Sequence, residues 1–235
     1  MFKMNWSISH KPYEVIERGA TPYGIYFAIA LPSEPQPIPT HIWNRLHKKE
    51  QLIAKDLKGF RRISFVGGRL AAKKALQSIQ REHLYIAKDP FGAPQLPSPL
   101  SVSISHKKEV AIALLSKQPK TTVGIDIEAL TPERLRIAPK ILTPAEMEIF
   151  SSLPSERQWG FLLVAFSTKE SIFKVLAPRL KRYIDFSEAE VFPTAHHIST
   201  IKLRLKENSP SPKEINARYT WNDEYVITSV QAVWH

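Results

Sequence analysis

The stretch Val123-Gly-Ile-Asp-Ile-Glu128 alternates apolar and polar residues with a period of two. This pattern predicts a β-strand, because successive side chains of a strand point to opposite faces. The β-carbons of Asp126 and Glu128 are then expected on one face, about 6–7 Å apart. Two carboxylates that close repel each other unless a cation lies between them, and hard oxygen ligands suit Mg²⁺. Taken alone, the pattern fits a solvated acidic edge strand at least as well.

Further along the chain, Phe-Ser-Thr-Lys-Glu-Ser-Ile-Phe-Lys at 166–174 falls in an expected helix of about Gln158–Leu176. Glu170 and Lys174 are spaced i, i+4 and share a helix face. Lys169 falls in a mostly apolar stripe, so it needs either a stem that snorkels to solvent or an anionic partner. The alternative for Glu170 and Lys174 is an ordinary surface ion pair.

Ser-Ile-Ser-His at 103–106 lies earlier in the chain than the strand at 123–128. It ends the first strand of an expected hairpin, and Val110–Leu115 is the second strand. Ser105 and His106 can donate hydrogen bonds to phosphate oxygens. The chain has no Gly-x-Ser-x-Gly nucleophile elbow, which argues against a serine hydrolase. The alternative for His106 is an ordinary turn residue.

Two helices are expected before this hairpin, one from His41 to about Leu57, ended by Gly59, and one from about Ile63 to Ser78. Basic residues cluster on the second helix and just before it: Arg61, Arg62, Arg69, Lys73 and Lys74. The cluster fits a phosphate-binding face, and a solvated basic helix is the alternative. Thr143 and Pro144 are expected to be the N-cap and first residue of a further helix. The C-terminal part, 201–233, is predicted to form three strands.

The order of these elements predicts an α+β protein. The spacing of Phe65, Arg69 and Lys73 repeats in the helix at 166–174, and each helix is followed by a hairpin. We therefore expect two similar α+β halves, residues 1–118 and 119–235.

The composition restricts the class of protein further. The 235 residues carry a net charge of +11, which implies an anionic partner, and contain no cysteine, which excludes disulfides and thiolate metal sites. No apolar run reaches the roughly 20 residues of a membrane span. Met1–His10 lacks the apolar region of a signal peptide. We expect a cytoplasmic protein with no membrane span.

Taken together and in this order, the motifs resemble those of the 4'-phosphopantetheinyl transferase superfamily, in its Sfp-type branch and the enterobactin-synthetase kind. The motifs are Gly-Arg-x-Ala, Gly-x-Pro, Ser-x-Ser-His, Gly-Ile-Asp-Ile-Glu and Lys-Glu-x-x-x-Lys, and they cover residues 46–177. The resemblance implies a monomer of two α+β halves related by pseudo-two-fold symmetry, with the coenzyme site at their interface. It also implies Mg²⁺-dependent transfer of 4'-phosphopantetheine from coenzyme A to a serine of an apo acyl or peptidyl carrier protein, with release of 3',5'-ADP.

The resemblance also implies roles for individual residues. Asp126, Glu128 and Glu170 would hold Mg²⁺, while Lys174 would bind the phosphate under attack and Lys169 would lie beside it. The catalytic set is Asp126, Glu170 and Lys174, and the acceptor proton would pass to Glu170 or to a metal-bound water. The remaining coenzyme contacts would be made by Arg62, Arg69, Phe91, Gly92, Ala93, Pro94, Ser105 and His106.

Two departures from the family pattern are Phe166, where Trp is frequent, and Ala93, where Lys is frequent. Three rival readings stay open at this point: a nucleic-acid-binding protein, a non-catalytic binder of coenzyme A or carrier protein, and a Mg²⁺-dependent phosphohydrolase. The spread of basic residues along the chain, without a recognisable nucleic-acid-binding module, disfavours the first, and we expect no nucleic-acid partner.

Overall fold

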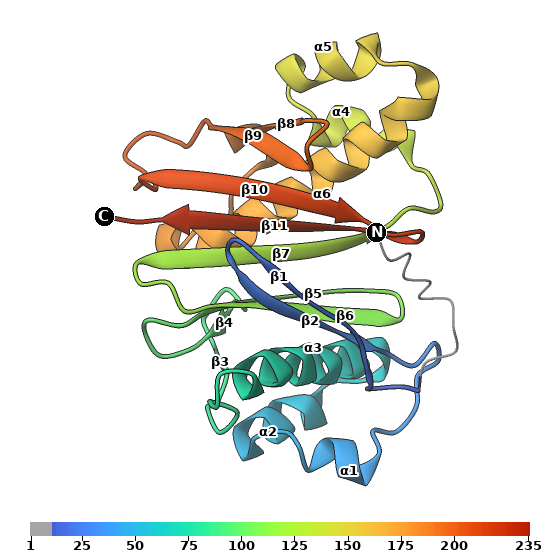
Figure 1. Cartoon of the computed structure of the whole chain (residues 1–235), viewed down its shortest axis with the longest axis vertical. Coiled ribbons are helices and arrows are strands. Elements are labelled where there is room, and N and C mark those ends of the chain that lie inside the picture. Colours follow the sequence, from blue (N-terminus) through green and yellow to red (C-terminus); the bar gives the residue numbers. More distant parts are fainter. Residues whose placement is uncertain (1–10) are drawn as a thin grey trace. The chain divides into compact units, whose positions relative to one another are not determined.

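The structure, a computed structural model, describes residues 11–235. The chain divides into two compact units, of which one comprises residues 11–119 and the other Lys120–His235. Each unit combines β-strands with helices (Figure 1), so the predicted α+β class is confirmed. None of the helices in this described part of the chain has the length and apolar character needed to cross a bilayer. Met1–His10, for which the sequence predicts no signal peptide, lies outside the described residues.

The first unit contains an antiparallel four-stranded sheet in the order β1-β2-β6-β5. Its strands are β1 (Val15–Thr21), β2 (Gly24–Ala30), β5 (Ser101–Lys107) and β6 (Val110–Ser116). Its other elements are α1 (Thr40–Trp43), α2 (Lys48–Asp56), α3 (Gly59–Gln77) and the short hairpin β3 (Ala87–Lys88) and β4 (Pro94–Gln95). The helix α3 packs on β2, β5 and β6.

Two glycines of α3 allow this close packing. A β-carbon on Gly67 would lie 2.1 Å from Cδ2 of Leu31, and one on Gly68 would lie 2.6 Å from Cγ2 of Ile104. Both distances are far below van der Waals contact, so with any larger residue either the Leu31 and Ile104 side chains or the helix would have to move. The Gly-Gly-Arg motif therefore places the basic residues of α3 by bringing the helix backbone against β5.

The single helix expected from His41 to about Leu57 is wrong. The structure has two short helices, because the first ends at Trp43 and His47 caps the start of the second. The His47 Nδ1 atom accepts from the Lys49 amide at 3.2 Å, and Glu50 accepts from the His47 amide at 2.9 Å. This reciprocal arrangement is a capping box, which starts a new helix. Gly59, expected to end a helix, begins α3 instead, with φ of +53°.

The second unit contains an antiparallel five-stranded sheet in the order β7-β11-β10-β9-β8. Its strands are β7 (Thr121–Ala129), β8 (Ala189–Pro193), β9 (Ile198–Leu203), β10 (Glu214–Trp221) and β11 (Tyr225–Val233). Its helical elements are η1 (Leu135–Ile137), α4 (Ala138–Ile141), α5 (Pro144–Ser152), α6 (Ser155–Leu180) and η2 (Phe186–Glu188). The helix α6 packs on β7, β11 and β8, and its apolar face joins the strands in one core.

Several local predictions are confirmed. The strand at 123–128 lies within β7, the hairpin forms as β5 and β6, and the helix at 158–176 lies within the longer α6. Thr143 caps α5 and Pro144 occupies its first turn, as expected. The pseudo-two-fold symmetry and the coenzyme site at the interface of two halves stay predictions.

Candidate active site

Gly124 sets how closely α6 approaches β7. A β-carbon at this position would lie 2.1 Å from the carbonyl oxygen of Ser171 and 2.9 Å from Cγ2 of Val175. Only a residue without a side chain lets the helix backbone lie against the strand at this point. The glycine of the Gly-Ile-Asp-Ile-Glu motif therefore brings the polar face of β7 within reach of side chains on α6.

Lys174 and Asp126 meet across this contact, although 48 residues separate them in the chain. The Lys174 Nζ atom lies 2.9 Å from Oδ1 of Asp126 and also donates to the carbonyl oxygen of Ile125 at 2.8 Å. Asp126 is 4% exposed. A carboxylate this buried needs a cation or hydrogen-bond donors, and the lysine supplies both.

The second oxygen of the Asp126 carboxylate belongs to a buried hydroxyl network. Ser167 Oγ donates to Oδ2 of Asp126 at 2.8 Å and lies 3.0 Å from the hydroxyl of Thr228. Thr228 Oγ1 donates to the Ser167 carbonyl oxygen and lies 2.8 Å from Oγ of Ser171. All three hydroxyl side chains are buried. The network links β7, α6 and β11, and it fixes the orientation of the Asp126 side chain.

Glu128 and Glu170 border the same contact. Glu128 lies two residues after Asp126 on the strand, and Glu170 lies one helical turn before Lys174, so each shares a face with one member of the pair. Both glutamates are half-buried. Within residues 11–235, no three Asp, Glu, His or Cys side chains gather into a group that could hold a metal ion. The structure thus brings Asp126 and Lys174 into contact but does not gather the three predicted carboxylates.

Lys169 does not take the place predicted for it beside Lys174. Its side chain is fully buried, and its ammonium donates to Glu146 at 2.7 Å and to the carbonyl oxygens of Ile141 and Phe186 at 2.8 and 2.9 Å. Burial lowers the pKa of Lys169, and the hydrogen bond to Glu146 opposes that shift. With its three protons donated inside the core, the ammonium cannot bind a coenzyme phosphate. Of the two reasons expected for this lysine, the anionic partner is the correct one.

The two arginines predicted to contact the coenzyme, Arg62 and Arg69, differ in whether the fold already uses their hydrogen-bond donors. Arg62 donates through Nε and a terminal nitrogen to the carbonyl oxygens of Ala54, Lys55 and Leu57. These are the carbonyls at the C-terminal end of α2, so Arg62 caps that helix, which gives it a structural role in place of the predicted one.

Arg69, in contrast, is 5% exposed, and its Nε has no hydrogen-bond partner among the described residues. Its guanidinium lies 4.7 Å from the ring centroid of Phe65. Burial lowers the pKa of Arg69, while the nearby charge of Glu50 opposes the shift. A buried guanidinium with uncommitted donors is suited to an anionic ligand.

The loop around Gly-Ala-Pro is held by one aspartate. Asp89 Oδ1 accepts from the amides of Phe91 and Ala93 at 2.9 and 2.8 Å. Gly92 has φ of +93°, a left-handed conformation that favours glycine. The loop continues through Pro94 into β4. Phe91 is 56% exposed, so this turn presents an aromatic ring to solvent on a constrained backbone.

Ser105 and His106 are neighbours in the regular ladder of β5 with β6 and therefore point to opposite faces of the sheet. Ile104, on the His106 face, packs against Gly68 of α3. His106 thus lies on the face covered by the helix that carries Arg69, and Ser105 does not. His106 is exposed, whereas Ser105 is 8% exposed.

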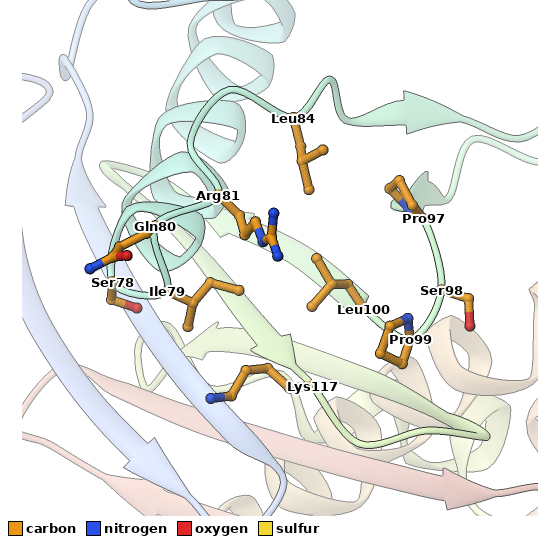
Figure 2. Close-up of a pocket in the computed structure, with 10 residues that line it drawn as sticks. All are labelled: Ser78, Ile79, Gln80, Arg81, Leu84, Pro97, Ser98, Pro99, Leu100 and Lys117. Carbon is orange, nitrogen blue, oxygen red and sulfur yellow. The ribbon is translucent and has the colours of Figure 1, made fainter.

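A pocket of about 570 Å³ in the first unit involves none of the predicted site residues. It is formed by the segment after α3, the segment before β5, and the residue after β6 (Figure 2). Arg81 and Lys117 lie on its walls, together with apolar residues such as Leu84 and Leu100. Because β5 and β6 are antiparallel, this pocket lies at the opposite end of their hairpin from His106.

Sequence reasoning missed three contributors. Ser167 and Thr228 support Asp126, and Glu146 neutralises Lys169. Ser167 lies inside the helix motif, so its position three residues before Glu170 was a usable signal. Thr228 and Glu146 lie far from the motif in sequence, and only the folded sheet brings them to α6.

Comparison with known proteins gives matches over both units. Residues 122–230 match the model of the 4'-phosphopantetheinyl transferase superfamily, and residues 48–116 match that of the 4'-phosphopantetheinyl transferase N-terminal domain.

Among individual proteins, the chain is 32% identical over 178 residues to enterobactin synthase component D of Salmonella typhimurium, covering 74% of this chain and 73% of that protein. It is 32% identical over 146 residues to the 4'-phosphopantetheinyl transferase Npt of Nocardia iowensis, covering 61% and 64%. A crystal structure of a holo-(acyl-carrier-protein) synthase from Bacillus anthracis in complex with CoA (3',5'-ADP) superposes with a TM-score of 0.40 and 18% identity, over 48% of this chain and 96% of that one.

Proposed function

The chain belongs to the 4'-phosphopantetheinyl transferase superfamily, and we propose that the contact between β7 and α6 is its catalytic centre. As a member of this family, the protein is a transferase that moves 4'-phosphopantetheine from coenzyme A to a carrier protein. We assign catalysis to Asp126, Glu170 and Lys174. The acceptor is a serine hydroxyl of an apo acyl or peptidyl carrier protein, and 3',5'-ADP is the leaving group.

The observation that carries this proposal is the 2.9 Å contact between Lys174 Nζ and Asp126 Oδ1. A strand residue and a helix residue of two separate motifs meet there, and Gly124 provides the space for that meeting. Glu170 lies one turn from Lys174 on the same helix face. A carboxylate and a lysine in contact, with a second acid one helical turn from the lysine, suit chemistry on a pyrophosphate.

The donor set at this contact fits Mg²⁺. This ion prefers oxygen ligands and is usually bound by one or two carboxylates, with substrate phosphates and waters completing its octahedron. A closed cage of three protein carboxylates is therefore not required. Asp126 and Glu170 would hold the ion, with Glu128 as an additional ligand. When bound, Mg²⁺ neutralises charge on the coenzyme pyrophosphate.

The chain's own residues then perform the remaining steps. Lys174 binds the oxygens of the phosphoryl group under attack and stabilises charge that develops on them. Ser167 and Thr228 keep the Asp126 carboxylate in one orientation. The carrier serine attacks the phosphorus in line with the leaving ADP, and its proton passes to Glu170 or to water.

The coenzyme contacts of the first unit are assigned from the position of each side chain and from the hydrogen bonds it makes within the fold. The Arg69 guanidinium, together with His106 on the same side of the sheet, supports binding of a phosphate group of coenzyme A. The constrained turn from Phe91 to Pro94 supports contact with the adenine ring, with Ala93 contributing its backbone alone. Arg62 and Lys169 are structural residues in this assignment.

We also propose that the protein acts as a cytoplasmic monomer composed of the two halves expected from sequence. A chain without cysteine is compatible with a reducing compartment. The net charge of +11 favours an acidic protein partner and speeds its association, an effect that salt screens.

Two assays test these assignments. Conversion of apo carrier protein by Glu170→Gln should fall by at least about 100-fold while the circular dichroism spectrum is unchanged, because a metal ligand is lost. Full activity of this variant would refute the metal role. Added salt should raise KM for the carrier protein more than KM for coenzyme A, and equal responses would argue against electrostatic docking.

A further inference from the structure

Lys174 occupies the same oxygen that a metal ion would need. In the structure, Oδ1 of Asp126 is paired with the Lys174 ammonium, and Oδ2 accepts from Ser167. A divalent cation at Oδ1 would lie close to the lysine charge, and two cations at one oxygen repel each other. The observed arrangement is therefore an alternative to metal binding.

Ser167 and Lys174, which both contact the Asp126 carboxylate, differ in how firmly they are held. Ser167 is fully buried and is tied to Thr228, which is tied in turn to Ser171. The Lys174 side chain is 27% exposed and is attached through a flexible four-carbon stem. The Oδ2 contact is thus a fixed part of the fold, whereas the Oδ1 contact can be exchanged.

We propose that Lys174 is the resident counter-ion of Asp126 in the ligand-free protein and exchanges with the divalent cation. On binding, Lys174 gives up Oδ1 of Asp126 and turns its ammonium to a phosphate oxygen of the coenzyme. This inference rests on the proposed function, because it takes Asp126 as a metal ligand. One lysine then serves both states, since it neutralises the Asp126 carboxylate before the exchange and binds the substrate after it.

The exchange couples metal binding to coenzyme binding. Without coenzyme, a metal ion must displace Lys174 from a buried carboxylate, and no phosphate is there to receive the ammonium. With coenzyme present, the displaced ammonium finds a phosphate. The metal ion and coenzyme A should therefore tighten each other's binding, and linkage requires the two effects to be equal.

The test measures metal affinity and not catalysis. Mn²⁺ binding to the full chain would be followed by electron paramagnetic resonance, with and without coenzyme A and without carrier protein. In Lys174→Met, Mn²⁺ alone should bind at least about fivefold tighter than in the wild type, and the tightening by coenzyme A should largely disappear. Lys181→Met is the matched control, because it removes the same charge from an exposed lysine that follows α6.

Asp126→Asn separates the two levels of the proposal. If this variant binds Mn²⁺ as the wild type does, with and without coenzyme A, Asp126 is not a metal ligand and the exchange falls with it. If Asp126→Asn loses Mn²⁺ but Lys174→Met binds it no tighter than Lys181→Met, the exchange alone is overturned. Should Lys174→Met not fold, Lys174→Gln carries the same comparison with the same criterion.

Discussion

Lys169 Nζ lies 2.7 Å from Glu146 Oε2, and neither side chain is exposed to solvent. Glu146 also accepts from the backbone amides of Thr143 and Val191, both at 2.6 Å. The pair therefore ties α6 to the start of α5 and to β8. Because Lys169 precedes Glu170 in the helix, this buried anchor holds the part of α6 that carries the residues proposed for catalysis.

Removing one partner of this anchor should be costly. Lys169→Met leaves the Glu146 carboxylate buried without its cation, and we expect a loss of about 3–5 kcal/mol in the free energy of unfolding. The double variant Lys169→Met with Glu146→Gln should recover part of that loss, because it removes both charges. Urea denaturation measures both values. Equal stability of the wild type and the single variant would contradict the structural role.

Gly124→Ala should damage the proposed catalytic centre through packing alone. The added methyl group would lie 2.1 Å from the Ser171 carbonyl oxygen, so α6 must move away from β7. We expect a loss of about 1–3 kcal/mol in the free energy of unfolding. We also expect kcat to fall by more than this loss of stability explains, because Lys174 moves away from its site.

Gly160→Ala is the matched control for that variant. It lies on the same helix, and nothing lies within 4 Å of its added β-carbon. Alanine there should stabilise the protein by about 0.5–1 kcal/mol and leave kcat unchanged. Similar effects of the two substitutions in thermal unfolding and in the transfer assay would refute the packing argument.

Arg62 and Arg69 of α3 should separate binding from stability. Arg69→Met removes a charged donor that has no hydrogen bond at Nε, so coenzyme A affinity should fall roughly 10- to 100-fold while the unfolding temperature holds or rises. Arg62→Ala should lower the unfolding temperature and leave the affinity unchanged, because it uncaps α2. Calorimetry with coenzyme A and thermal unfolding give both readouts, and the reverse pattern would contradict the assignment.

Glu188 should make the second unit sensitive to acid. Hydrogen bonds from Arg182 lower the pKa of this carboxyl from 4.5 to about 2. A depressed carboxyl pKa contributes stability above the unfolded value of 4.5, and that contribution disappears as the pH falls towards 2. The loss should be about 1–2 kcal/mol, since Arg182 is partly exposed and solvent screens the pair. Glu188→Gln should flatten the dependence of the free energy of unfolding on pH between 4.5 and 2. An unchanged slope in this variant would contradict the role of Glu188 in the acid sensitivity.

Much of the fold could be predicted from local pattern. The alternation at 123–128, the hairpin at 102–115 and the helix at 158–176 all form where the periodicity places them. The break between α1 and α2 could not be predicted in this way, because apolar spacing continues through it. It depends on the His47 side chain acting as a cap, which is an uncommon choice of capping residue.

The candidate site could be predicted only in part, for a similar reason. The motifs identified Asp126, Glu170 and Lys174, but they could not tell which polar side chains are already committed within the fold. Arg62 and Lys169 have the residue types of phosphate ligands, and the structure uses both to hold helices in place. Partners such as Glu146 come from distant segments, so burial and pairing had to be read from the folded chain.

The most direct test of the account is the intact mass of an apo carrier protein after incubation with this protein, coenzyme A and Mg²⁺. We predict that the carrier gains the mass of one 4'-phosphopantetheine group on its acceptor serine, and that Asp126→Asn and a chelator each abolish the gain. An unmodified carrier with the wild-type protein, across a panel of acyl and peptidyl carrier proteins, would contradict the claim that the Asp126 and Lys174 contact is a transferase centre.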